Sequence, residues 1–154
     1  MSETKRGRIA DFLEQRRFAM VGVSHNTRDF SRTLFRAFLE RGYDVVPVHP
    51  SADEMDGKPV ARSLSAITPP PESVLLMTPP SVTEVLVHEC AAVGVKRIWM
   101  YRATGAGAVS AKAIEFCREN GIQAVPGECP MMFLRGTGWI HRVHGWVRRI
   151  TAAD

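Results

Sequence analysis

The last third of the sequence contains a thiol, a carboxylate and two imidazoles that could do chemistry. Glu128 and Cys129 are adjacent, and His141 and His144 follow, three residues apart. Side chains with that spacing share one face of a helix, which suits metal ligation, and Cys129 would complete a Cys/His₂ site. Alternatively, a histidine would activate the Cys129 thiol as a nucleophile. A structural interpretation stays open beside both, in which the histidines cover a helix surface and Cys129 packs or contacts a ligand.

A second stretch that could bind a ligand is MVGVSHNTRDFSR, residues 20–32. In it, a glycine and a polar loop join an apolar run to an amphipathic helix. Asp29 and Ser31 are both candidate caps for this helix. The amides at a helix start favour an anion, and Arg28 and Arg32 flank them, so the turn would suit a phosphate. The alternative is a capped helix with solvated arginines. Two glycines of the G-x-G-x-x-G pattern are missing, which argues against NAD in its usual binding mode.

Three further turns follow apolar runs. His49-Pro50 stands where a nicotinamide-binding domain usually has an acidic residue, and the histidine would hydrogen-bond a ribose or a phosphate or else lie on the surface. The turn at residues 78–81, TPPS, brings small hydroxyls close to a ligand. The turn at residues 102–107, RATGAG, would cradle a phosphate with its amides or serve as a surface connection.

A repeated pattern indicates the elements that position these turns, because helical segments end at a glycine where a β-rich run begins. Gly42, Gly94 and Gly121 fit the left-handed position just past a helix end. Apolar runs predict strands at residues 18–23, 45–48, 74–77, 97–101 and 122–125. Continuous apolar runs are typical of a parallel sheet that is covered on both faces. We therefore predict an α/β fold: a Rossmann-like, doubly wound, mainly parallel five-stranded sheet with helices on both faces, which binds ligands beyond the carboxyl ends of its strands.

Apolar spacing also predicts which helix faces are buried. The helix before Gly42 is expected to bury Leu34, Phe35, Phe38 and Leu39. The helix before Gly94 is expected to bury Val82, Val85, Leu86, Cys90 and Val93. Ser81 and Glu84 match a capping box, which places the start of that helix near residue 81. We expect an irregular connection at residues 50–71 with a short helix near residues 64–67, and a final helix at residues 133–150 that packs Trp139 and Trp146 on the sheet.

Length and composition narrow the class of protein. A chain of 154 residues with 45% hydrophobic content predicts one domain over residues 1–154, with its core at about residues 10–130. The net charge is +4, but the basic residues are spread along the chain, so we expect no nucleic-acid partner. Three widely spaced cysteines without a CxxC pair predict reduced thiols in a cytoplasmic protein. We expect neither a signal peptide nor a membrane partner, since no stretch reaches the roughly 18 apolar residues of a span.

Six short stretches occur in a fixed order: VGVS at 21–24, GYDVVPVHP at 42–50, DGKPV at 56–60, TPPS at 78–81, GVKRIWM at 94–100 and ECP at 128–130. Together they resemble the CoA-binding domain family, the stand-alone relatives of the N-terminal domain of the succinyl-CoA synthetase alpha subunit. The resemblance implies CoA or acyl-CoA as the ligand, with its phosphates at residues 24–32, its adenosine end beside His49-Pro50, its adenine flanked by residues 78–82, and its pantetheine arm near residues 103–105. The implied binding residues are Gly22, Val23, Ser24, Arg28, Ser31, Arg32, His49, Pro50, Thr78, Pro79, Pro80, Ser81, Val82, Ala103, Thr104 and Gly105.

The sequence departs from this family at two places. Relatives usually have Asn where His49 stands, and a shorter W-x-Q-x-G turn where this chain has WMYRATGAG. The synthetase carries its phosphorylated histidine on a following ligase domain, so we do not expect an acyl-CoA ligase that acts alone. The main hypothesis is a CoA or acyl-CoA binding protein without catalytic activity of its own, which acts as a sensor or accessory subunit, with a protein partner or as a homo-oligomer. The alternatives are a small metal- or thiol-dependent enzyme that uses Cys129, His141 and His144, and a protein-association module without a ligand.

Overall fold

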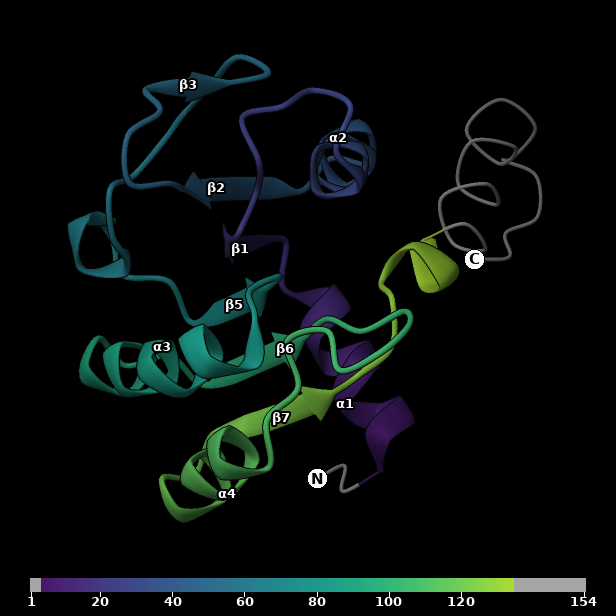
Figure 1. Cartoon of the computed structure of the whole chain (residues 1–154), viewed down its shortest axis with the longest axis vertical. Helices are drawn as coiled ribbons and strands as arrows, with labels where there is room; N and C mark the ends of the chain where they lie inside the picture. Colours follow the sequence, from purple (N-terminus) through teal and green to yellow (C-terminus); the bar gives the residue numbers. More distant parts are fainter. Residues whose placement is uncertain (1–3, 135–154) are drawn as a thin grey trace.

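The computed structural model describes residues 4–134, and its centre is a five-stranded sheet with the order β2-β1-β5-β6-β7 (Figure 1). All four neighbouring pairs of strands are parallel. The strands are β1 (Arg17–Val21), β2 (Asp44–Val48), β5 (Ser73–Leu76), β6 (Arg97–Met100) and β7 (Gln123–Pro126). Each predicted strand matches one of them to within one or two residues at each end. The predicted α/β, Rossmann-like parallel sheet is therefore confirmed.

Helices cover both faces of the sheet because its strand residues alternate between two apolar clusters. Phe18 and Met20 of β1 pack on one face with α1 (Lys5–Glu14) and α2 (Phe30–Glu40). Ala19 and Val21 of the same strand pack on the other face with α3 (Pro80–Ala92) and α4 (Ala111–Glu119). Figure 1 shows the two helix pairs on opposite sides of the sheet. Since both faces are buried, the strands read as continuous apolar runs and not as alternating ones.

The N-terminal helix α1 was not anticipated from the sequence. It begins after Thr4, whose side chain accepts a hydrogen bond from the Gly7 amide, and it buries Ile9 and Phe12. The Phe12 ring packs edge-on against Trp99 of β6, at 5.4 Å between ring centroids. The segment is rich in charge and has a weakly amphipathic pattern, so its burial depends on the apolar sheet surface that it covers.

The connection between β2 and β5 contains more structure than predicted. The 3₁₀ helix η1 (Leu64–Ala66) confirms the short helix expected there. In addition, β3 (Glu54–Met55) and β4 (Lys58–Pro59) form an antiparallel hairpin. Asp56 and Gly57 at its turn both have positive φ, 49° and 83°. An Asp-Gly pair with this geometry is a strong hairpin signal, so the DGKPV stretch itself carried the information.

Some helix predictions were right and two were wrong. Gly42, Gly94 and Gly121 have positive φ just past the helix ends, as expected. However, Val82 and Val85 are 41% and 69% exposed, and α3 buries Thr83 and Val87 together with the predicted Cys90. Apolar residues occur on several sides of α3, so spacing alone could not select the face that meets the sheet.

The capping box predicted at the start of α3 does not form. The cap is Pro79, with no side-chain hydrogen bond, so Ser81 lies inside the first turn. Glu84 accepts a hydrogen bond from the Ser110 hydroxyl at 2.6 Å and thereby links α3 to the start of α4. Pro80 has no amide hydrogen that needs a partner, and the amides of Val82 and Thr83 donate to the Pro79 carbonyl oxygen at 3.0 and 2.9 Å.

The predicted C-terminal helix at residues 133–150 lies almost entirely outside the described residues, and with it Trp139, Trp146, His141 and His144. Residues 131–134, the last described, are helical, and Leu134 is buried. None of the described helices has the length and apolar content that crossing a bilayer requires.

Candidate functional site

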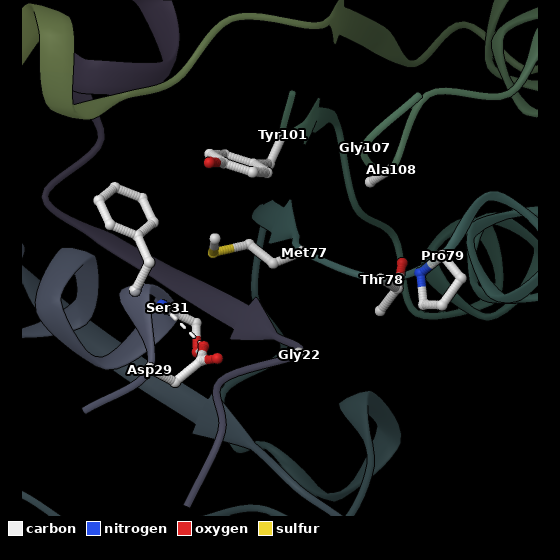
Figure 2. A pocket seen from close by; sticks show the side chains of 10 residues that line it. Gly22, Asp29, Ser31, Met77, Thr78, Pro79, Tyr101, Gly107 and Ala108 are labelled. Atoms are coloured by element: carbon white, nitrogen blue, oxygen red, sulfur yellow. Dashed lines mark hydrogen bonds between the residues drawn. The ribbon is translucent and has the colours of Figure 1, made fainter. Parts of the chain in front are cut away.

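The strand order places a crevice between β1 and β5. From β1 the chain goes to β2 on one side and then returns to β5 on the other side. Helices leave β1 and β5 toward opposite faces, so the loops at their carboxyl ends diverge, and ligands of open α/β sheets bind at such a switch point. A pocket of about 370 Å³ lies there (Figure 2). It is lined by Gly22, Asp29, Phe30, Ser31, Met77, Thr78, Pro79, Tyr101, Gly107 and Ala108.

Gly22 forms the floor of this crevice and cannot be replaced easily. Its φ is +100°, and an added Cβ would lie 2.3 Å from the Met77 carbonyl oxygen. The close approach follows from the sheet itself, because the Met77 amide donates to the Val21 carbonyl oxygen at 2.8 Å. Only glycine combines a positive φ with the absence of a side chain. This first glycine of the expected turn is thus required by the backbone geometry.

The start of α2 already holds an anion, because the capping residue is Asp29. Its Oδ2 accepts hydrogen bonds from the Ser31 amide, at 2.9 Å, and from the Ser31 hydroxyl. The amides of Arg32 and Thr33 donate to its backbone carbonyl oxygen at 3.0 and 3.3 Å. The Ser31 hydroxyl lowers the pKa of Asp29, and the Ser31 amide lowers it further. The expected phosphate cradle is therefore occupied by the protein's own carboxylate.

Arg32 does not point into the pocket. Its side chain is 6% exposed, and Nε and Nη2 each lie 3.0 Å from Oδ2 of Asp56 in the β3–β4 turn. Its Nη1 donates to the carbonyl oxygens of Ser24 and His25, at 3.2 Å each. The guanidinium thus holds the β1–α2 loop to the hairpin, an arrangement that differs from the phosphate contact expected of this residue.

Arg28 is placed differently from Arg32. Its backbone amide donates to Oδ1 of Asn26, but its guanidinium makes no hydrogen bond or ion pair with any residue from 4 to 134. The residue is exposed, on the loop beside the pocket. Of the two arginines that flank this turn, Arg28 is the one whose charge is available to a ligand.

The segments that follow β5 and β6 form the opposite side of the pocket. Thr78 is buried, and its hydroxyl bonds to the Thr83 hydroxyl at 2.8 Å. After β6, the Ala108 amide donates to the Tyr101 carbonyl oxygen at 2.7 Å, which folds the 102–107 turn back on itself. A Cβ on Gly107 would lie 2.3 Å from that same oxygen. Burial, and secondarily the neighbouring Cys129 thiol, raise the pKa of Tyr101, so its hydroxyl stays protonated.

The profile of the family described as CoA binding domain matches residues 16–135, a range that contains every element just described except α1. The chain belongs to the CoA-binding domain family. This finding confirms the resemblance that the short sequence stretches indicated.

Several proteins are similar to this CoA-binding domain protein. Protein YneT of Bacillus subtilis strain 168 is 26% identical over 134 residues, which cover 84% of this chain and 93% of YneT. The solved structure of a hypothetical protein from Pyrococcus horikoshii OT3 is 26% identical, with a TM-score of 0.74 over 84% of this chain and 88% of that one. The dinucleotide-forming acetyl-coenzyme A synthetase 1 of Ca. Korarchaeum cryptofilum, in complex with phosphate and ADP, is 19% identical, with a TM-score of 0.62 over 71% of this chain and 25% of that one. At this identity, the synthetase shows the fold alone.

The binding residues expected for this CoA-binding domain lie in four groups. Gly22, Ser31, Thr78 and Pro79 line the pocket. Those on the loops and helix starts that contribute to the pocket, but outside its lining, are Val23, Ser24, Arg28, Arg32, Pro80, Ser81 and Val82. His49 and Pro50 follow β2, none of whose residues lines the pocket. Those in the exposed turn after β6 are Ala103, Thr104 and Gly105. Sequence reasoning missed six lining residues: Asp29, Phe30, Met77, Tyr101, Gly107 and Ala108. Met77 and Tyr101 are the last residues of predicted strands, and the other four lie in segments that follow predicted strands.

His49 has a local structural role at the end of β2. The amides of Ser51 and Ala52 donate to its Nδ1, at 3.1 and 3.0 Å. Because Nδ1 accepts both bonds, the ring hydrogen lies on Nε2. These two bonds shape the turn that follows β2. The His49 ring also packs edge-on against His25, at 5.7 Å between centroids.

The three cysteines carry free thiols in very different surroundings. Burial, together with the nearby Cys117, raises the pKa of Cys90 to about 12, and burial raises that of Cys117 to about 11. Cys129 is half-buried, beside Tyr101. Within residues 4–134, no three His, Cys, Asp or Glu side chains form a metal-binding group. The metal site proposed with His141 and His144 depends on residues outside that range.

Thiol labelling should distinguish these cysteines. In the folded protein at neutral pH, Cys129 is expected to react with iodoacetamide roughly 100-fold faster than Cys90 or Cys117, because only Cys129 is accessible and the other two are buried as neutral thiols. Peptide mapping by mass spectrometry after timed labelling measures the three rates, and a denatured sample provides the reference. Rapid labelling of Cys90 in the folded protein would contradict its burial against the sheet.

Proposed function

We propose that this protein binds CoA or an acyl-CoA at the β1–β5 switch point and has no catalytic activity of its own. The observation that carries the proposal is the position of the pocket. It lies at the carboxyl ends of β1, β5 and β6, where a doubly wound sheet binds nucleotide-like ligands, in a chain of the CoA-binding domain family.

The character of the pocket supports one orientation of the ligand. Phe30, Met77 and Tyr101 give it a largely apolar wall, which suits the pantetheine arm and the acyl end of CoA. Asp29 makes the start of α2 unsuitable for phosphate. We therefore place the phosphates outside the pocket, next to the available guanidinium of Arg28, and the adenosine toward His49 and Pro50. Arg32 would contribute by holding the loop and not by touching the ligand.

The polar groups of the pocket support binding more than catalysis. The closest arrangement to a nucleophile and base is the Ser31 hydroxyl with the Asp29 carboxylate. The hydrogen bonds that fix this carboxylate lower its pKa, which makes it a weak base. The Ser31 oxygen also accepts a bond from the Ser24 amide at 2.9 Å. Both groups are thus used to shape the loop.

The free thiols of the three cysteines fit a reducing compartment such as the cytoplasm.

A thermal-shift comparison of CoA, dephospho-CoA, NAD and ATP tests the proposal. We expect CoA to raise the melting temperature and NAD to leave it unchanged. Arg28→Ala should weaken CoA binding about tenfold, through the loss of a charge-assisted hydrogen bond to phosphate. Arg6→Ala, on the exposed side of α1, is the matched control and should bind as the wild type does. If none of the four ligands stabilises the protein, the proposal fails.

The non-catalytic part of the proposal has its own measurement. Acetyl-CoA incubated with the protein should release free thiol no faster than in buffer, as followed with a thiol-reactive dye. Thiol release that depends on protein concentration and disappears in Cys129→Ser would instead support the thiol-dependent enzyme.

A further inference from the structure

The pocket contains one charged side chain. Of its ten lining residues, only Asp29 and Tyr101 can ionise. Burial raises the pKa of Tyr101, so this hydroxyl is neutral at physiological pH. Asp29, whose pKa is lowered, is ionised there. The electrostatic character of the pocket is consequently set by a single negative charge.

The Asp29 carboxylate is fixed in position. It caps α2, and both of its hydrogen bonds, from the amide and the hydroxyl of Ser31, reach the same oxygen, Oδ2. No residue from 4 to 134 donates a hydrogen bond to the other oxygen, Oδ1. A capping carboxylate cannot rotate away from an incoming anion without exposing helix amides. One carboxylate oxygen therefore stays available to whatever enters the pocket.

No cation neutralises this charge among the described residues. The nearest arginines along α2, Arg32 and Arg36, both approach Asp56, at 3.0 and 3.7 Å. Arg36 also donates to the Thr27 carbonyl oxygen at 3.1 Å. Arg28, one residue before Asp29, makes no ion pair with it. The Asp29 carboxylate therefore meets the pocket without an ion-pair partner among residues 4–134.

The wall that faces this carboxylate is apolar. Figure 2 shows Met77 and Tyr101 across the pocket from Asp29 and Ser31. The Phe30 ring lies 6.1 Å from the Tyr101 ring, with 36° between their planes, and Phe30 is 42% exposed. An exposed aromatic side chain at a pocket edge gains stability when an apolar group covers it. A neutral hydrocarbon or thioester group fits this wall, whereas a second carboxylate would come close to the unpaired Oδ1 of Asp29.

We propose that Asp29 is a specificity-determining residue, which makes the pocket prefer CoA thioesters with an uncharged acyl group over those whose acyl group ends in a carboxylate. The inference rests on the proposed function, since it assumes that the acyl end enters this pocket. Like charges that are held close together repel, and selection of this kind acts by rejecting the wrong ligand as much as by binding the right one.

Butyryl-CoA and succinyl-CoA form a matched pair for the test, because their acyl groups both have four carbons and differ in the terminal carboxylate. Isothermal titration calorimetry should show the wild type binding butyryl-CoA about tenfold more tightly than succinyl-CoA. Asp29→Asn and Asp29→Ser both keep a good helix cap and remove the charge. In both variants, the affinity ratio should fall to near one, mainly because succinyl-CoA binds more tightly.

The controls separate this inference from the proposed function. Glu40→Gln removes an exposed carboxylate at the far end of α2 and should leave the affinity ratio unchanged. Melting temperatures of the Asp29 variants close to that of the wild type would show that the cap is intact. A wild-type ratio near one, or a wild-type ratio retained in Asp29→Asn, overturns the inference while CoA binding stands. If neither thioester binds the wild type, the proposed function itself fails, and this inference fails with it.

Discussion

Gly22→Ala is expected to reduce the free energy of unfolding by roughly 3 kcal/mol, through backbone strain and a forced separation of two strands. The φ of +100° is unfavourable for alanine, and its Cβ would lie 2.3 Å from the Met77 carbonyl oxygen. The clash is with backbone, so no side-chain rotation relieves it. Since Gly22 also lines the pocket, CoA should no longer stabilise the variant. Urea denaturation, with and without CoA, measures both effects.

Gly57→Ala is the matched control for this substitution. Gly57 has a φ of +83°, but no atom would lie within 4 Å of an added Cβ. We expect Gly57→Ala to lower the free energy of unfolding by roughly 1 kcal/mol, from backbone strain alone. Equal losses in the two variants would contradict the argument, because the contact with Met77 would then cost nothing.

Arg32→Met is expected to lower the free energy of unfolding by roughly 2–3 kcal/mol. This is somewhat less than for a fully buried ion pair, because the Asp56 side chain is 25% exposed. Methionine retains much of the aliphatic packing but removes every polar contact of the guanidinium. The Asp56 carboxylate would keep only the Arg36 contact at 3.7 Å, and the carbonyl oxygens of Ser24 and His25 would lose a donor. The β1–α2 loop should loosen, which urea denaturation and amide exchange of residues 24–28 can measure.

A double-mutant cycle with Asp56→Asn tests whether the ion pair causes this loss. The double variant should lose less stability than the sum of the two single variants, with a coupling energy of about 1–2 kcal/mol. Arg62→Met is the control, because Arg62 pairs with Asp53 at 2.7 Å but both side chains are exposed. Arg62→Met should lower the free energy of unfolding by less than about 1 kcal/mol. Strict additivity of Arg32→Met and Asp56→Asn would show that the pair makes no net contribution.

The parallel sheet and the position of the pocket could be predicted because their signals are local. Each strand is a short apolar run such as that of Val74, Leu75 and Leu76, which only a sheet with two covered faces buries completely. The turns that follow the strands are then the ligand side of the fold by topology. The signal for the β3–β4 hairpin is equally local, because an Asp-Gly pair such as Asp56-Gly57 favours a two-residue turn.

Other features could not be predicted, because they depend on partners far apart in the chain. Helix α1 is stable through contacts of Phe12 with Phe18 and Trp99, at 5.1 and 5.4 Å between rings. The buried face of α3 is chosen by packing against η1 and α4, and so Val85 remains exposed. Burial of an apolar residue requires a surface to meet it, and that surface is built by the rest of the fold.

The sequence by itself determined the strands, the glycines that follow the helices, and the family to which the chain belongs, since these depend on residue types at short spacing. Only the tertiary structure decided what the residues of the β1–α2 turn do. Arg32 pairs with Asp56, 24 positions away, and is thereby withdrawn from the ligand side. Asp29 caps α2 and supplies the only charge among the pocket-lining residues. A charged side chain pairs with the group that lies nearest in space, and in a folded chain that group need not be near in sequence.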